Sequence, residues 1–234
     1  MKNYRLKLLM LLAIVFSIAG VAAVSAQSWQ RREKVDLGVF IKEIVSIKVS
    51  ANLAQSAIWL PFEFYIESNR IQGKSTEQIE RELAPLKPYL VFMVQCSAEN
   101  PDASLTYESI QQLHARAILK AKNGSETKPL TKIPKLLSVR LKAIKSLMSQ
   151  DSPQSAANMH ILVFPLKNTA GAAIVNTNTR DKLTLVLNAG ALFEKAVFTW
   201  RTPFDALTQE VICPRCRENA SAKWHYCPWC GNRL

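Results

Sequence analysis

The 234-residue sequence has few cysteines and few acidic residues. Only five cysteines occur, and four of them fall within residues 213–234, which excludes a disulfide framework across the whole chain. Asp and Glu number 18 against 30 Lys and Arg, so the formal charge is +12 and acidic partners are favoured. Apolar residues make up 48% and charged residues 21%, which excludes both a disordered polyelectrolyte and a protein with many membrane spans.

Catalytic signatures are also missing. The sequence contains no G-x-S-x-G, H-E-x-x-H or P-loop pattern. Its three histidines, His114, His160 and His225, lie far apart in the chain and in no recognisable motif. We therefore expect no catalytic residues and a protein that is not an enzyme, although distant residues can still converge in space.

The N-terminal stretch has the layout of an export signal. Three positive charges within residues 1–7 precede the apolar run 8–16 and a stretch of small residues. Residues 24–26 place small side chains where a signal peptidase reads them, which predicts cleavage before Gln27. The alternative is a retained membrane anchor, because residues 8–30 carry no charge and about 20 apolar residues span a bilayer. Either interpretation places the body outside the cytoplasm, in the periplasm or elsewhere in the cell envelope.

Most of the central region is predicted to form strands. Alternating apolar residues predict strands over 39–49 and 60–66, and a continuous apolar run predicts a strand buried on both faces over 89–96. Residues 113–122 are ambiguous between helix and strand, but the Asn123-Gly124 turn signal after them favours a strand. The later strands, separated by turn residues, are expected over 160–165, 172–176, 183–187 and 196–200.

Two helices are expected. Ser75 and Gln78 form a capping-box pattern at the start of a helix over 76–86, and apolar residues at helical spacing predict an amphipathic helix over 133–148. Six basic residues and no acid occur in and before the second helix: Lys128, Lys132, Lys135, Arg140, Lys142 and Lys145. Such a helix can bind an anionic surface. The simpler interpretation is that its apolar stripe faces the core while the charged groups of its Lys and Arg side chains lie in water.

The C-terminus contains the most specific pattern of the chain. Cys213-Pro214-Arg215-Cys216 and Cys227-Pro228-Trp229-Cys230 are two C-P-x-C turns with ten residues between them. One turn can aim two thiolates at a single point, and two facing turns supply the four soft donors of a tetrahedral zinc site. Gly231 follows the second turn at a position that often requires a positive φ.

This stretch resembles the short bacterial zinc-ribbon domains over residues 213–234. Those domains contain two C-P-x-C-G turns and an aromatic residue before the third cysteine, where Tyr226 stands in this sequence. Arg217 replaces the glycine of the first turn, a departure expected to strain it. The resemblance implies that one structural Zn²⁺ is bound by four ligands, Cys213, Cys216, Cys227 and Cys230.

Other uses of the cysteines remain open. Outside the cytoplasm the four thiols can form two disulfides or a dithiol redox pair, and iron or a catalytic metal is a further alternative. Four soft ligands with no open position favour structural zinc over catalysis. Cys96 lies in the buried strand and is expected to be an inert core thiol.

These elements predict a mainly β, α+β fold, in which an antiparallel sandwich-like domain with two helices precedes a small zinc ribbon. The expected domains are a signal peptide or anchor at 1–26, a linker at 27–36, the strand-rich domain at 37–208 and the ribbon at 209–234.

The predicted function is that of an exported, non-enzymatic envelope protein whose ribbon contacts another envelope protein. Candidate binding residues are Trp224, Tyr226, Trp229 and Arg215, although aromatic packing over the metal is an alternative use of the rings. Nucleic-acid binding and an extracytoplasmic thiol–disulfide oxidoreductase are the alternative functions. The membrane would be contacted only through residues 8–30, and only if the signal is not cleaved.

Overall fold

The computed structural model describes residues 30–148 and 156–234, and residues 31–234 form one compact unit. The predicted signal peptide or anchor at 1–26 lies outside the described residues, as does the start of the linker. Among the helices of the described ranges, none combines the length and the apolarity that crossing a bilayer requires.

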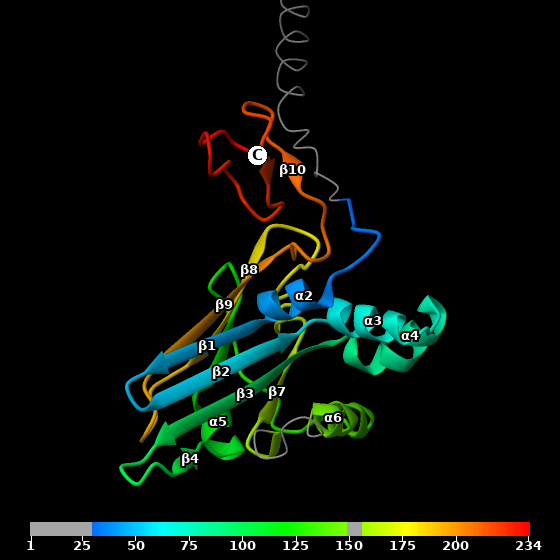
Figure 1. The fold of residues 1–234 in the computed structure, drawn as a ribbon. Helices are drawn as coiled ribbons and strands as arrows, with labels where there is room; N and C mark the ends of the chain where they lie inside the picture. The colour runs from blue at the N-terminus through cyan, green and yellow to red at the C-terminus, as the bar shows by residue number, and fades with distance from the viewer. Residues whose placement is uncertain (1–29, 149–155) are drawn as a thin grey trace, which may run out of the picture. The chain divides into compact units, whose positions relative to one another are not determined.

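Two antiparallel sheets form the body (Figure 1). In the first sheet, β3 pairs with β2 along one edge and with β4 and β7 along the other, and β1 pairs with the far edge of β2. Its strands are β1 (Val45–Ser50), β2 (Leu53–Leu60), β3 (Tyr89–Glu99), β4 (Leu105–Tyr107) and β7 (His160–Pro165). The second sheet has the order β6-β5-β8-β9. Its strands are β5 (Ala117–Lys120), β6 (Glu126–Thr127), β8 (Asp181–Leu187) and β9 (Ala196–Thr202).

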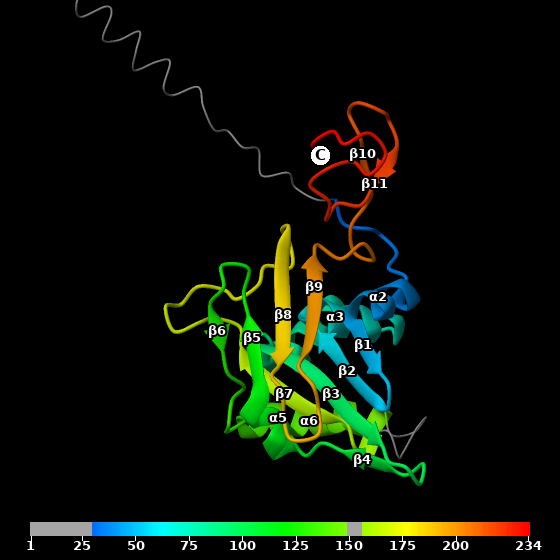
Figure 2. The same cartoon turned by 90° about the vertical axis from the view of Figure 1, so that its left-hand side faces the viewer.

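Aromatic side chains fill the space between the two sheets. Trp200 of β9 lies with its ring centroid 6.1 Å from Trp59 of β2 and 5.3 Å from Phe92 of β3. All three side chains are buried, and burial of aromatic area is a large stabilising contribution. Figure 2 shows the second sheet in front of the first, with their strands at an angle to one another. The predicted mainly β, α+β class with packed antiparallel sheets is confirmed.

Helices cover the other face of the first sheet. Strand β3 is therefore buried on both faces, as its continuous apolar run predicts, and Met93 and Phe92, which point to opposite faces, are both fully buried. The helices that lie wholly within the described residues are α2 (Leu37–Ile44), α3 (Phe62–Ile71), α4 (Thr76–Leu83), the 3₁₀ turn η1 (Ala84–Leu86), α5 (Ile110–Arg116) and α6 (Lys135–Met148). Both expected helices form, and the expected number of two is too low.

The predicted strand over 39–49 is wrong in its first half. Helix α2 occupies Leu37–Ile44, and the strand begins only at Val45. The Asp36 carboxylate caps the helix by accepting hydrogen bonds from the N–H groups of Gly38 and Val39. Apolar residues at 37, 40, 41 and 44 have the helical spacing that would have revealed this helix.

The predicted strand over 60–66 is wrong as well. Strand β2 ends at Leu60, and helix α3 starts at Phe62 directly after Pro61. The apolar residues of α3 alternate because the helix is covered on more than one side. Phe64 packs edge-on against Phe40 of α2, while Tyr65 is buried.

Two later predictions also need correction. Residues 113–122, for which a strand was favoured over a helix, contain part of each: helix α5 ends at Arg116, and strand β5 follows at Ala117. Ser109 and Gln112 form the capping box that starts α5, a signal present in the sequence. Residues 172–176 form no strand; Ala173 makes a single bridge with Lys167, and the buried Ile174 and Val175 side chains explain the apolar run.

One ion pair lies inside the body, between α5 and the loop before it. Arg116 Nη2 is 2.6 Å from Glu108 Oε2, and the two side chains are 5% and 2% exposed. The same guanidinium donates to Gln55 Oε1 at 2.8 Å and to the Asn188 carbonyl at 2.6 Å. Cys96 lies against it at 3.5 Å, and burial, followed by the Glu108 charge, raises the pKa of the Cys96 thiol to about 12. The prediction of an inert core thiol at Cys96 agrees with this environment.

Candidate metal centre

The C-terminal cysteines are held by two turns that share one backbone pattern. The first turn connects the short strands β10 (Val211–Ile212) and β11 (Asn219–Ala220), and two hydrogen bonds close it. The Cys213 N–H donates to the Glu218 carbonyl at 2.9 Å, and the Arg217 N–H donates to the Cys213 carbonyl at 3.0 Å. This arrangement leaves both cysteine side chains of the turn on one side.

The second turn repeats these contacts at the equivalent positions. The Cys227 N–H donates to the Asn232 carbonyl at 2.7 Å, and the Gly231 N–H donates to the Cys227 carbonyl at 2.9 Å. Gly231 has φ 70°, as the sequence pattern predicts. The two C-P-x-C turns therefore have matching backbone geometry.

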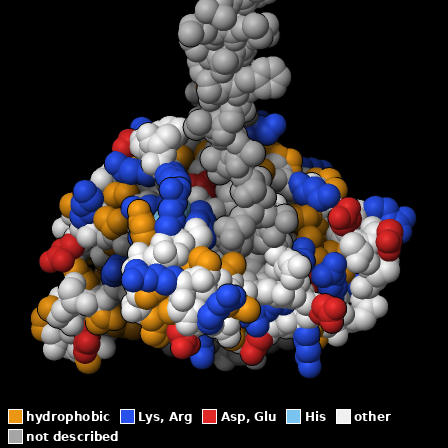
Figure 3. Space-filling view, turned by 90° about the horizontal axis from the view of Figure 1, so that it is seen from above, with side chains coloured by type: hydrophobic (Ala, Val, Ile, Leu, Met, Phe, Trp, Pro, Cys, Tyr) orange, Lys and Arg blue, Asp and Glu red, His pale blue; other side chains and the backbone are white. Residues whose placement is uncertain are grey.

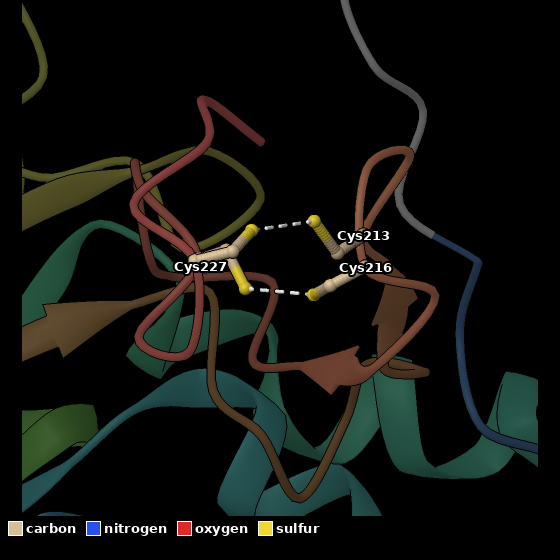
Figure 4. Close-up of side chains that lie close together, drawn as sticks. Cys213, Cys216 and Cys227 are labelled. Atoms are coloured by element: carbon tan, nitrogen blue, oxygen red, sulfur yellow. Dashed lines mark hydrogen bonds between the residues drawn. The ribbon is translucent and has the colours of Figure 1, made fainter.

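The two turns face each other through their sulfur atoms (Figure 4). Cys213 Sγ lies 3.6 Å from Cys230 Sγ, and Cys216 Sγ lies 3.5 Å from Cys227 Sγ. All four sulfurs are within 4.8 Å of one another, and all four residues are free thiols. Four sulfurs 2.3 Å from a tetrahedral zinc ion are about 3.8 Å apart, whereas disulfide-bonded sulfurs are about 2.05 Å apart. The spacing fits a four-sulfur metal site.

Backbone N–H groups stabilise negative charge on these sulfurs. The Cys216 N–H, helped by that of Arg215, lowers the pKa of Cys213 to about 6. The Glu218 N–H acts in the same direction on Cys216, but burial and the other three thiols outweigh it and raise the pKa of Cys216 to about 12. Cys213 and Cys216 thus ionise unequally, and a divalent cation bound by the cluster would favour the thiolate form of its ligands.

Arg217 occupies the glycine position of the first turn with φ 64°. A non-glycine residue in this left-handed region costs about 1–2 kcal/mol, and glycine loses about 0.5–1 kcal/mol more chain entropy on folding. We expect Arg217→Gly to stabilise the turn by up to about 1 kcal/mol. In competition with a chelator, the dissociation constant for added zinc should therefore fall roughly fivefold. The matched control is Arg215→Gly, where φ is not positive. Zinc binding that is unchanged or weaker in Arg217→Gly would contradict the strain argument.

The predicted binding residues lie on the ribbon with different exposures. Trp224 is 38% exposed, Trp229 59% and Tyr226 64%. The two indole rings lie side by side with centroids 6.1 Å apart. Arg215 is exposed on the first turn. None of these side chains is buried.

Polar contacts tie the ribbon segment to the body. The Lys223 ammonium lies 2.8 Å from Glu43 Oε1 of α2 and 2.6 Å from Asp205 Oδ2. The Arg180 guanidinium donates to the carbonyls of Ala222 and Leu234 at 2.9 and 3.1 Å. These contacts link residues far apart in the sequence, so no local pattern could have revealed them. The boundary at 208/209 and the independent folding of the ribbon stay predictions.

Several basic side chains lie near His225 of the ribbon. Partial burial, and then the charges of Arg180, Lys122, Arg233 and Arg201, lower the pKa of His225. Figure 3 shows Lys and Arg side chains spread among apolar ones on this face, with Asp and Glu mainly toward its edges. The surface near the candidate metal centre is therefore positive.

No protein-family model matches the chain, and no curated protein matches its sequence. Among solved structures, a DUF4426 family protein from Pseudomonas aeruginosa is similar over 68% of this chain and 93% of that one, with 10% sequence identity and a TM-score of 0.30. A TM-score this low supports no argument about fold or function. The site is therefore interpreted from its own geometry.

Proposed function

We propose that the four C-terminal cysteines bind one structural Zn²⁺ that stabilises the ribbon. We further propose that this ribbon is the surface through which an exported, non-enzymatic envelope protein contacts another protein. The observation that carries the proposal is the mutual approach of four free sulfurs within 4.8 Å. A segment of this size has almost no hydrophobic core, and a metal ion supplies the missing stabilisation. Cys213, Cys216, Cys227 and Cys230 would hold the ion and leave no position open for a substrate.

Exposed aromatic side chains support the contact role. Trp224, Tyr226 and Trp229 present apolar area to solvent, and aromatic residues are enriched in the centres of protein–protein interfaces. If the rings served mainly to pack over the metal, they would be more deeply buried than they are. A partner that buries the Trp224–Trp229 pair is the simplest use of this surface.

The envelope location rests on the N-terminal sequence alone. Positive residues, an apolar run and small residues before Gln27 together favour export. Cell fractionation followed by N-terminal sequencing of the purified protein tests it: the proposal predicts material outside the cytoplasm. Recovery in the cytoplasm with an intact N-terminus would contradict it.

The contact role is tested by photo-crosslinking from the ribbon in cells. A crosslinking residue in place of Trp229 is expected to yield one dominant adduct, and the same residue in place of Leu105, which is 51% exposed on β4, is the matched control. The adduct should disappear when Cys227→Ser is added, because the ribbon surface depends on the metal. Equal adducts from both positions, or an adduct that persists without the metal site, would contradict a ribbon-specific contact.

Nucleic-acid binding is the second candidate, because basic side chains surround the exposed aromatic ones. Phosphate contacts release counterions, so the affinity for duplex DNA or RNA would fall steeply as salt rises. Arg233→Gln and Arg201→Gln would each lower the slope of log affinity against log salt by about 1. An affinity that is absent or independent of salt removes this candidate.

The thiol–disulfide alternative has less support from the geometry. An oxidoreductase pairs the two cysteines of one C-x-x-C turn, whereas the 3.6 and 3.5 Å sulfur contacts join cysteines of different turns. Such contacts suit ligands that converge on one ion.

A further inference from the structure

A cavity of about 550 Å³ lies between the first sheet and helices α2, α3, α4 and α6, away from the cysteines. Ile58 and Leu60 of β2, Phe64 of α3 and Ile144 of α6 supply apolar walls. Ile41 of α2 also lines the cavity and is 45% exposed, so the cavity is accessible at this side. Small-molecule sites have volumes of about 300–1,000 Å³ and mostly apolar walls with a few polar groups, and this cavity meets both criteria.

Among the residues that the structure describes, one buried polar group of this lining has no hydrogen-bond partner. Tyr65 is 7% exposed and lines the cavity, and its buried hydroxyl makes no hydrogen bond within residues 30–148 and 156–234. A buried hydroxyl without a partner is costly, and native proteins rarely keep one without a reason. Burial holds the pKa of Tyr65 above its usual range, so the group remains a hydrogen-bond donor. A ligand oxygen would satisfy it.

The charges around the cavity favour an anion. Lys74 and Glu82 lie in its lining and pair with each other at 2.7 Å. Arg140 of α6 also lines the cavity; it is exposed, and its charge adds to that of Lys74 in lowering the pKa of Glu82. Two cations and one carboxylate leave a net charge of +1. An excess positive charge and an unpartnered phenol hydroxyl therefore both belong to the lining of one apolar cavity.

From this combination we propose that the cavity binds a single-chain amphiphile with a carboxylate head group. The apolar chain packs against Ile58, Leu60 and Phe64, and the head group pairs with Arg140 and accepts a hydrogen bond from Tyr65. This binding site is independent of the metal centre and of the proposed contact role. No bond is made or broken, so the function of the cavity is binding alone.

Three amphiphiles of equal chain length test the proposal by isothermal titration calorimetry with the full chain, below the concentration at which each forms micelles. Dodecanoate is expected to bind saturably at one site per chain, and more tightly than dodecanol or dodecyltrimethylammonium. Arg140→Gln should weaken dodecanoate binding about tenfold and leave dodecanol binding unchanged. Lys142→Gln is the matched control, because Lys142 lies two residues away on the same helix but outside the cavity lining.

Two further variants separate binding from folding. Tyr65→Phe should weaken dodecanoate binding about fivefold while the ligand-free protein unfolds at the same or a higher temperature, since an unpaired hydroxyl is removed. Ala143→Phe should abolish binding by filling the cavity, whereas Val139→Phe, at an exposed position of α6 outside the lining, should not. The proposal is overturned if the wild type binds none of the three amphiphiles, if it binds all three equally well, or if Ala143→Phe binds like the wild type.

Discussion

Replacing Cys227 with serine is expected to leave the full-length protein with much less than one zinc ion per chain and with residues 209–234 unfolded. Zinc binding to such four-ligand sites is worth about 10–16 kcal/mol at neutral pH, which exceeds what a segment of this size can gain from burial. The two sheets have their own core around Trp59 and Trp200 and should stay folded. Metal analysis of the purified variant and limited proteolysis of its C-terminus measure the two effects.

The matched control is Cys96→Ser. Cys96 is the one cysteine outside the cluster, and serine there can still accept a hydrogen bond from Arg116 and donate to Gln55. This variant should keep one zinc per chain and a protease-resistant C-terminus. Zinc lost equally from both variants would mean that the cluster at 213–230 is not the metal site.

The second large effect is expected inside the body, at the buried Arg116–Glu108 pair. Glu108→Ala should lower the free energy of unfolding by about 3–5 kcal/mol, because it leaves the Arg116 charge buried without its carboxylate. The remaining partners of Arg116, such as the Asn188 carbonyl, are neutral and cannot replace the lost charge. Urea unfolding followed by circular dichroism measures the change.

An exposed ion pair of the same kind provides the comparison. Lys120 and Glu126 pair on the second sheet with side chains that are 41% and 49% exposed, and Glu126→Ala should cost at most about 1 kcal/mol. If Glu108→Ala costs no more than Glu126→Ala, the buried pair is not the stabilising element that its burial indicates.

Local patterns allowed prediction of the elements whose signals are unambiguous. The apolar run of β3 predicts a strand buried on both faces, and the 3.6-residue spacing of α6 predicts its helix. The cysteine spacing likewise predicts the cluster, because the two C-P-x-C turns fold through hydrogen bonds between residues at most five apart in the sequence. Such features depend little on the rest of the fold.

Prediction of helix or strand failed where packing against neighbouring elements, rather than the spacing of apolar residues, decides the secondary structure. The alternating residues Phe62, Phe64 and Ile66 suit a strand, but in α3 all three are partly buried against the core because neighbouring elements cover several sides of the helix. The Asp36 cap of α2 and the Ser109 capping box of α5 are present in the sequence. Apolar alternation nevertheless favoured a strand over 39–49, and the Asn123-Gly124 turn signal favoured one over 113–122. Interactions such as Arg116 with Glu108, or Tyr65 and Arg140 in one cavity, depend on the arrangement of whole elements and leave no local signal.

The most direct measurement is X-ray absorption at the zinc K-edge of the full-length protein, purified without added metal and quantified for zinc per chain. We expect one zinc ion with four sulfur neighbours at about 2.3 Å. A sample without zinc whose mass shows two disulfides, or a zinc ion bound mainly by oxygen and nitrogen, would contradict it.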